Sequence, residues 1–167
     1  AKYDGLAARV APALAGEIAG RLGILPGEEV FVAGSTHEGE ETVVLRVYGK
    51  LLESRPDMKL ILIPRHIERG TAVAEMIRQA GFSDCVTLSA IAAGRARRKE
   101  RVILVDVIGE LFKIYSLATV VFCGGSLVPR GGQNILEAAA WGKVVFHGPY
   151  MDDFRDEEAL LAEAGAG

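Results

Sequence analysis

Short apolar runs alternate with segments of helical periodicity along almost the whole chain. The strand-like runs are residues 29–33, 59–63, 86–88, 102–105, 118–123 and 143–146. Apolar side chains recur at helical spacing in residues 5–22, 39–54, 68–80, 109–117, 134–141 and 153–164. Such alternation is typical of βαβ units, whose parallel strands are buried on both faces. We therefore predict an α/β fold, with a Rossmann-like parallel sheet of about six strands and helices on both faces.

Length, charge and cysteine content limit what such a domain can be. The 167 residues fit one domain with one core. Lys and Arg number 19 and Asp and Glu number 22, a balance that argues against a nucleic-acid partner. No apolar run is long enough for a membrane span. Two cysteines, Cys85 and Cys123, are too few for a disulfide framework or a Cys-based zinc site and predict buried free thiols.

Glycine is the one residue type in clear excess. The chain holds 20 glycines, and six of them lie between Gly124 and Gly148. Glycine lets a backbone approach a ligand closely, and ligands of an open parallel sheet bind beyond the carboxyl ends of its strands. The pattern therefore predicts a ligand site built from strand-to-helix loops.

The first such loop, residues 34–39, follows the first predicted strand. Its backbone N–H groups and the hydroxyls of Ser35 and Thr36 suit a phosphate or a carboxylate. A capping box formed by Ser35 and Glu38 explains the same residues without a ligand, and both readings stay open. The loop has no P-loop lysine and is not a dinucleotide-binding glycine motif.

Two further loops follow predicted strands. Arg65, beside His66, offers a planar cation to a phosphate, unless it pairs with Glu68. Around Gly109, backbone N–H groups suit an anion, unless Asp106 simply caps the next helix. The basic run at 92–101 is interpreted as a solvated loop.

The longest loop, residues 124–137, carries two double glycines. Asn134 is a suitable helix cap, and Glu137 then lies in the first turn. The Glu137 carboxylate also suits a ribose diol, and four glycines in nine residues exceed what capping needs. We therefore favour ligand binding here. No catalytic triad and no pair of catalytic carboxylates can be assembled from the sequence.

Taken in order, these motifs resemble a known family. They are Gly-Ser-Thr-His-Glu-Gly-Glu-Glu at 34–41, Pro-Arg-His at 64–66, Asp-x-x-Gly-Glu-Leu at 106–111 and Gly-Gly-Ser-Leu-Val-Pro-x-Gly-Gly-x-Asn-x-Leu-Glu at 124–137. Gly148-Pro149 and residues 154–156 continue the match. Over nearly the whole chain, the sequence is similar to the C-terminal half of 3-deoxy-D-manno-octulosonic acid (Kdo) transferases.

The resemblance implies one half of a GT-B glycosyltransferase. Residues 1–167 would form the C-terminal nucleotide-sugar-binding domain, with the N-terminal acceptor domain and the last C-terminal helices lying outside this sequence. The family transfers Kdo from CMP-Kdo to a lipid A precursor in lipopolysaccharide biosynthesis. It does so at the cytoplasmic face of the bacterial inner membrane, with which the full-length protein would associate peripherally.

The same resemblance implies which residues lie near the donor. It assigns no catalytic residue to this chain, because the general base belongs to the missing domain, and it implies no metal and no cofactor besides the donor substrate CMP-Kdo. The isolated chain is therefore expected to bind CMP without catalysis. The implied donor-binding residues are Ser35, Thr36, Arg65, His66, Ile108, Gly109, Glu110, Gly125, Ser126, Asn134 and Glu137.

Several positions depart from the family pattern. Gln133, Ile135 and Ala138 stand where the family usually has His, Pro and Pro, and Gln carries no proton charge at neutral pH. Two alternatives therefore stay open. One is a GT-B transferase or epimerase that uses a UDP-sugar, and the other is a non-catalytic phosphate-binding module. For the Kdo transferase domain that the resemblance implies, exposed apolar surface is expected where the partner domain docks.

Overall fold

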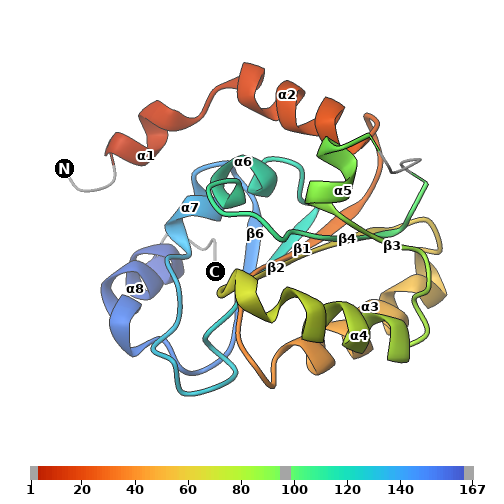
Figure 1. Cartoon of the computed structure of the whole chain (residues 1–167). Coiled ribbons are helices and arrows are strands. Elements are labelled where there is room, and N and C mark those ends of the chain that lie inside the picture. The colour runs from red at the N-terminus through yellow and green to blue at the C-terminus, as the bar shows by residue number, and fades with distance from the viewer. Residues whose placement is uncertain (1–3, 95–98, 164–167) are drawn as a thin grey trace.

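Six parallel strands form one sheet in a computed structural model that describes residues 4–94 and 99–163 (Figure 1). The strands are β1 (Val30–Thr36), β2 (Lys59–Pro64), β3 (Cys85–Thr87), β4 (Val102–Leu104), β5 (Val120–Cys123) and β6 (Val144–His147). Their order across the sheet is β3-β4-β2-β1-β5-β6, and all neighbours pair in parallel. The predicted Rossmann-like sheet is confirmed.

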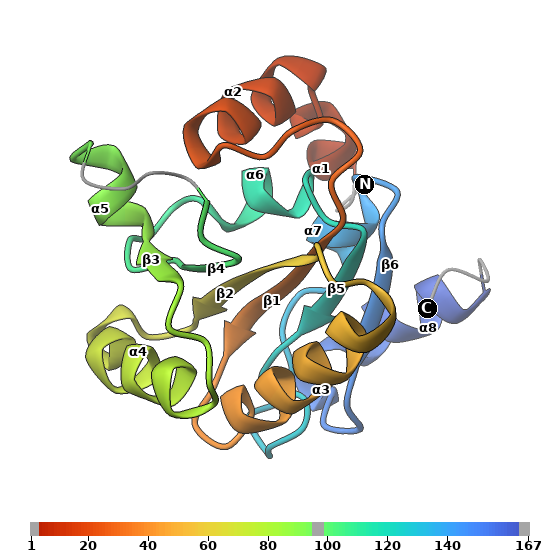
Figure 2. The same cartoon turned by 90° about the vertical axis from the view of Figure 1, so that its right-hand side faces the viewer.

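Helices cover both faces of this sheet, as predicted. Their bounds are α1 (Asp4–Arg9), α2 (Pro12–Leu22), α3 (Glu41–Ser54), α4 (Gly70–Gln79), α5 (Leu88–Ala92), α6 (Leu111–Tyr115), α7 (Leu136–Ala139) and α8 (Arg155–Glu163), with 3-10 helices η1 (Ile67–Arg69) and η2 (Asp152–Phe154). In both views α2, α5 and α6 lie on one side of the sheet and α3 and α4 on the other (Figures 1 and 2). Side chains of β1 alternate between the two faces of the sheet. Val30 and Val32 pack in the core on one face, and Phe31 and Ala33 pack in the core on the other.

Some helices and strands begin or end at residues other than those predicted. The predicted helix 5–22 is divided into α1 and α2 just before Pro12, whose ring lacks an N–H donor. Residues 34–36 belong to β1 and not to a loop. Helix α5 was not predicted, and it begins after Thr87, whose hydroxyl accepts a hydrogen bond from the N–H of Ala90 at 3.2 Å. In the basic run, residues 95–98 lie outside the described part of the chain.

The two cysteines are free thiols, as predicted, with Cys123 buried and Cys85 half-buried. Burial raises the pKa of the Cys123 thiol to about 12 and that of Cys85 to about 11. Within residues 4–94 and 99–163, no helix combines the length and the apolar character that crossing a membrane requires.

The topology indicates that a ligand would bind at the carboxyl ends of the strands, called here the carboxyl edge of the sheet. The connection after β1 leads to β2 on one side, whereas the connection after β5 leads to β6 on the other side. The carboxyl ends of β1 and β5 therefore form the switch point where open parallel sheets bind ligands. Four of the loops singled out in the sequence end at this edge.

Candidate functional site

A cleft of about 270 Å³ opens at the carboxyl edge of the sheet. It is lined by residues from the ends of β1 and β2, the segment between β4 and α6, and the start of α7. Seven of the predicted donor-binding residues share it, although they come from four separate motifs: Ser35, Arg65, Ile108, Gly109, Glu110, Asn134 and Glu137.

Four predicted residues do not line this cleft: Thr36, His66, Gly125 and Ser126. Thr36 and Ser126 are fully buried, and the Ser126 hydroxyl donates to the Cys123 carbonyl at 2.6 Å. The same hydroxyl accepts the N–H of Gly148 at 2.9 Å. The geometry therefore favours a supporting position for Ser126, beneath the cleft, in place of direct ligand contact.

The end of β1 takes an unusual backbone path at Ser35. This residue has φ +56°, and the β1–β2 register shifts between Gly34 and Thr36. Gly124, at the end of β5, lies so close that a Cβ there would stand 2.3 Å from the Ser35 carbonyl oxygen. Position 124 must therefore be glycine for β1 and β5 to meet in this way.

A buried carboxylate, Glu40, ties the loop after β1 to the loop after β5. Its Oε1 accepts the N–H groups of His37 at 2.8 Å and Gly125 at 2.7 Å. Its Oε2 accepts those of Ser126 at 3.1 Å and Leu127 at 2.9 Å. In loop 34–39, whose N–H groups one reading offered to a phosphate, the N–H of His37 therefore faces the protein's own carboxylate. Gly125 and Ser126 likewise offer no free backbone donor to a ligand.

The predicted capping box of Ser35 with Glu38 is wrong. Helix α3 begins at Glu41, two residues later than predicted, and Glu38 is exposed. It is Glu40 that reaches back to the N–H of His37. Only the carboxylate half of a capping box is present, between Glu40 and the N–H of His37, and Glu40, the N-cap of α3, makes no side-chain capping hydrogen bond to the helix.

The second double glycine, Gly131-Gly132, has an internal structural cause. A Cβ on Gly131 would meet the carboxylate of Asp153, and one on Gly132 would lie 2.6 Å from the Met151 sulfur. Gly131 also accepts the N–H of Asp153 at 3.0 Å. Close internal packing therefore accounts for the glycines of this loop. The prediction of a ligand site from the number of glycines is not supported, because these glycines do not by themselves require a ligand.

Arg65 is exposed at the mouth of the cleft, and among the described residues it forms no ion pair. The alternative reading, an Arg65–Glu68 pair, is wrong, because no ion pair among the described residues includes Arg65; the Glu68 carboxylate lies 3.9 Å from His66 Nδ1 instead. The half-exposed His66 ring packs edge-on against His37, with centroids 5.6 Å apart. A free guanidinium thus remains at this end of the cleft.

The acidic residues near Gly109 are held by other elements. Asp106 does not cap α6; it accepts hydrogen bonds from the backbone N–H and the hydroxyl of Ser89, at the start of α5. Glu110 accepts a hydrogen bond from Arg21 of α2 at 3.2 Å. Gly109 itself has φ +91°, and Ile108 beside it is 79% exposed, so this segment offers the cleft an apolar side chain and open backbone.

Asn134 and Glu137 occupy the far side of the cleft. The Asn134 side chain accepts the N–H of Leu136, the first residue of α7, at 3.0 Å. It is not the N-cap that one reading predicted, because the N-cap of α7 is Ile135 and has no side-chain cap hydrogen bond. Burial raises the pKa of Glu137, while Arg9 opposes the rise. Within the described residues the Glu137 carboxylate accepts no hydrogen bond, so it stays available to hydroxyl donors of a ligand.

Sequence reasoning missed the residues that shape the cleft from beneath. Tyr115 of α6 is fully buried, lines the cleft floor, and its hydroxyl lies 3.7 Å from the Cys123 sulfur. Its only sequence signal is an aromatic residue on an apolar helix, which is typical of any core. No group of three or more His, Cys, Asp or Glu side chains in the described ranges is arranged to hold a metal ion.

The six-stranded parallel sheet, with helices on both faces and a cleft at its switch point, is that of a Rossmann-like domain of the GT-B glycosyltransferase type. No protein-family model matches the chain. The sequence is nevertheless 40% identical over 137 residues to a probable 3-deoxy-D-manno-octulosonic acid transferase, mitochondrial, from Arabidopsis thaliana, covering 81% of this chain and 30% of that protein. It is 34% identical over 139 residues to the Aquifex aeolicus transferase, covering 83% of this chain and 37% of that protein.

A solved structure gives the same assignment. The C-terminal CMP-Kdo binding domain of WaaA from Acinetobacter baumannii superposes with a TM-score of 0.81 and 29% identity, over 93% of this chain and 81% of that one. The chain belongs to the Kdo transferase family, as a counterpart of its C-terminal domain. It spans about a third of the length of the curated relatives named above.

Proposed function

We propose that this domain binds the nucleotide of CMP-Kdo in the carboxyl-edge cleft, as the donor-binding domain of a Kdo transferase. The observation that carries the proposal is the meeting of seven residues from four motifs in one cleft at the switch point of the sheet. Packing alone does not require a free arginine, a free half-buried carboxylate and an exposed isoleucine to line the same small space.

Three residues have chemistry that suits the three parts of CMP. The Arg65 guanidinium supplies a charge-assisted donor to the phosphate. The Glu137 carboxylate accepts hydrogen bonds from the ribose hydroxyls, since no protein donor among the described residues competes for it. Ile108 offers an apolar surface to one face of the cytosine ring, and Gly109 leaves room for the base edge.

Gly125, Ser126 and Thr36 support the cleft in this proposal and do not touch the phosphate. Glu40 already takes the backbone donors of residues 125–127, so the phosphate is held by side chains. This differs from a glycine-loop phosphate site, in which the loop N–H groups themselves face the anion.

In the whole protein, the proposed reaction is transfer of Kdo from CMP-Kdo to a lipid A precursor at the cytoplasmic face of the inner membrane, with peripheral membrane association. The general base and the acceptor site would lie outside residues 1–167, so the 167 residues alone bind nucleotide and do not catalyse transfer. The cleft volume of about 270 Å³ is at the low end for a small-molecule site, consistent with a second surface completing it.

The test is a transfer assay on the full-length protein with CMP-Kdo and a lipid A precursor, with CMP and UDP compared as inhibitors. Transfer inhibited by CMP and insensitive to UDP supports the proposal. Inhibition by UDP with no use of CMP-Kdo indicates the UDP-sugar alternative. Unchanged transfer in Arg65→Ala would mean that this cleft does not bind the donor.

A further inference from the structure

Two adjacent carboxylates at the start of α3, Glu40 and Glu41, are fully buried. Glu40 binds backbone N–H groups of the loops after β1 and β5. Glu41 binds the segment between β2 and α4, residues 65–69, called here the β2–α4 segment. Its Oε1 accepts a hydrogen bond from Arg69 Nη2 at 2.8 Å, and its Oε2 accepts one from Arg69 Nη1 at 2.9 Å. The two glutamates together therefore contact the loops that follow three neighbouring strands.

The Arg69–Glu41 ion pair is bidentate and shielded from water. Two parallel N–H···O bonds fix the relative orientation of a guanidinium and a carboxylate, which a single contact does not. The Arg69 side chain is 20% exposed and that of Glu41 is fully buried, so little water competes for these bonds. Glu41 also lies in the first turn of α3, where the helix dipole favours a negative charge.

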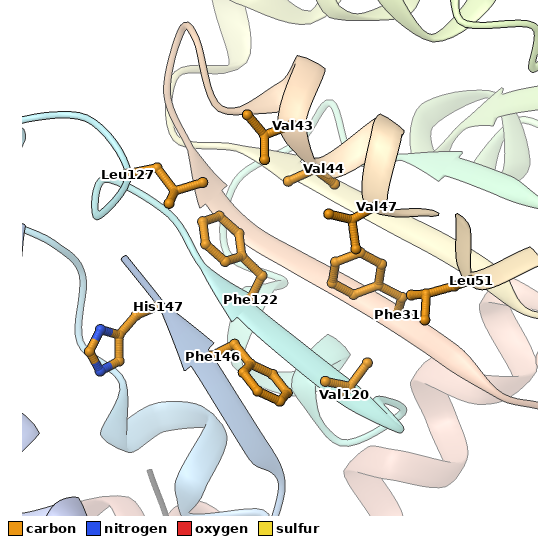
Figure 3. Close-up of a pocket in the computed structure, with 10 residues that line it drawn as sticks. All are labelled: Phe31, Val43, Val44, Val47, Leu51, Val120, Phe122, Leu127, Phe146 and His147. Carbon is orange, nitrogen blue, oxygen red and sulfur yellow. The ribbon is translucent and has the colours of Figure 1, made fainter. Parts of the chain in front are cut away.

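Helix α3 holds the Glu41 side of this pair in place. Val44 and Tyr48 are buried in the core beneath the helix. Val47 lies on the same side and points toward the ring of Phe31 in β1 (Figure 3). Because this packing fixes α3 on the sheet, the Glu41 carboxylate is a fixed point to which the β2–α4 segment is bound.

The β2–α4 segment is held at both of its ends. At its start the N–H of Arg65 donates to the Thr36 carbonyl at 2.9 Å, and at its end Arg69 binds Glu41. Arg65 and Ile67, which lie between these two contacts or beside them, line the donor cleft. The Arg65 guanidinium forms no ion pair among the described residues, so its position depends on the backbone that carries it.

Stability alone is a weak reason for such a pair. Burying two charges costs free energy that their attraction repays only in part, and apolar side chains of similar volume are often at least as stabilising. What a bidentate pair adds is a defined geometry. Here that geometry relates α3 to the segment that carries Arg65.

We propose that Arg69 and Glu41 are positioning residues for the donor phosphate, because their ion pair holds the β2–α4 segment with Arg65 at the mouth of the cleft before the nucleotide binds. Neither residue lines the cleft, so both act through Arg65. A cationic group that is already in place lowers the ordering cost of binding. The proposal rests on the proposed function, since it requires Arg65 to bind the phosphate.

A double-mutant cycle on the full-length protein tests the proposal. Calorimetric titration gives the dissociation constant of CMP for the native protein, Arg69→Lys, Arg65→Ala and the variant with both substitutions. Lysine keeps a positive charge opposite Glu41 but loses the bidentate contact. We expect Arg69→Lys to weaken CMP binding by about 5- to 10-fold when Arg65 is present and by less than about twofold when it is absent, because coupled residues are not additive.

The matched control is Arg78→Lys in α4. Arg78 also contacts one carboxylate, that of Glu75, through two N–H groups, but this pair is exposed. The control should leave CMP binding unchanged. Equal losses from Arg69→Lys with and without Arg65, or no loss in either case, would overturn the proposal. Native-like CMP binding by Arg65→Ala would instead refute the proposed function, and this inference with it.

A second variant decides the matter if Arg69→Lys does not fold. Glu41→Met combined with Arg69→Leu leaves no buried charge, and such replacements often preserve stability. Its melting temperature is expected to stay close to that of the native protein, while its CMP binding is expected to weaken as in Arg69→Lys. Native-like CMP binding by this variant would overturn the proposal, because the ion pair would then not be needed to position Arg65.

Discussion

The carboxylate of Glu40 accepts the backbone N–H of Gly125 at 2.7 Å, across 85 residues of sequence. Three further N–H groups, from His37, Ser126 and Leu127, converge on the same carboxylate. This contact holds the ends of β1 and β5 together at the switch point. It also gives the glycine loop an internal anion, so the loop supports the cleft and does not supply its backbone donors.

Glu40→Gln is expected to lower the free energy of unfolding by about 2–3 kcal/mol, because an amide NH₂ would face N–H donors that then lose their acceptor. Urea denaturation measures the change. Glu38→Gln is the matched control, since Glu38 is exposed two residues earlier and its replacement should leave stability within experimental error. Equal, small effects of both substitutions would contradict the central position of Glu40.

Gly124→Ala is expected to destabilise the domain by at least about 2 kcal/mol, because the new methyl group would meet the Ser35 backbone at 2.3 Å. Gly49→Ala provides the opposite control. Gly49 lies within α3 with open space around it, so alanine should raise stability by about 0.5–1 kcal/mol. Thermal melting of both variants checks the pair. A neutral Gly124→Ala would show that β1 and β5 do not approach this closely.

Burial is the largest cause that lowers the pKa of His37 below its ordinary 6.5, with His66 and Arg130 adding to it. The unfolded chain therefore takes up a proton at this histidine before the folded domain does. Stability should be fully present above pH 6.5 and should fall as the pH drops below it. In His37→Gln this slope should be shallower in melting curves between pH 5 and pH 7.5. An unchanged slope would exclude His37 as its source.

Arg65→Ala is expected to weaken CMP binding by about 10- to 100-fold, the effect of losing one hydrogen bond to a charged group. Its melting temperature should not change, because Arg65 is exposed and has no ion-pair partner among the described residues. Arg46→Ala, on the exposed surface of α3, should alter neither property. Calorimetric titration measures both affinities. Undiminished affinity in Arg65→Ala would remove Arg65 from the site.

Burial raises the pKa of Glu137 above its ordinary 4.5, so this carboxylate takes up a proton at a higher pH than an exposed one. The ionised form offers both oxygens as acceptors and adds a negative charge to the hydrogen bonds from the ribose hydroxyls, whereas protonation turns one oxygen into a donor. The affinity ratio of the native domain to Glu137→Gln should therefore be largest at neutral pH and should decline as the pH falls through the raised pKa. The titration of CMP itself cancels in the ratio, and a ratio independent of pH would contradict the assignment.

The fold followed from the sequence because its signals are local. Short apolar runs and helical periodicity give the alternation directly, and Pro12 and Thr87 account for two of the differing boundaries. The site was only partly predictable. Its motifs lie where strands end, so their convergence at one edge follows from parallel strands.

The internal partners at this edge were not predictable from local spacing. From local spacing, the sequence offered a capping box between Ser35 and Glu38, and Asp106 as the cap of the helix that follows it. In the structure Glu40 crosses to the loop after β5, and Asp106 bonds to Ser89, 17 residues earlier. These partners depend on which loops the sheet order brings side by side. The glycines at 124 and 131 likewise reflect contacts with distant segments, which residue counts do not reveal.

The central claim is that the carboxyl-edge cleft binds a cytidine nucleotide, and a titration of the 167-residue domain with CMP tests it most directly. Amide resonances recorded during the titration should shift saturably at Gly109, Asn134 and Glu137, with UDP producing little change at the same concentrations. The amide resonances of Val47 and Phe146, on the α3 face of the sheet and away from the cleft, should not shift. The absence of shifts around the cleft, or identical shifts with UDP, would contradict the account.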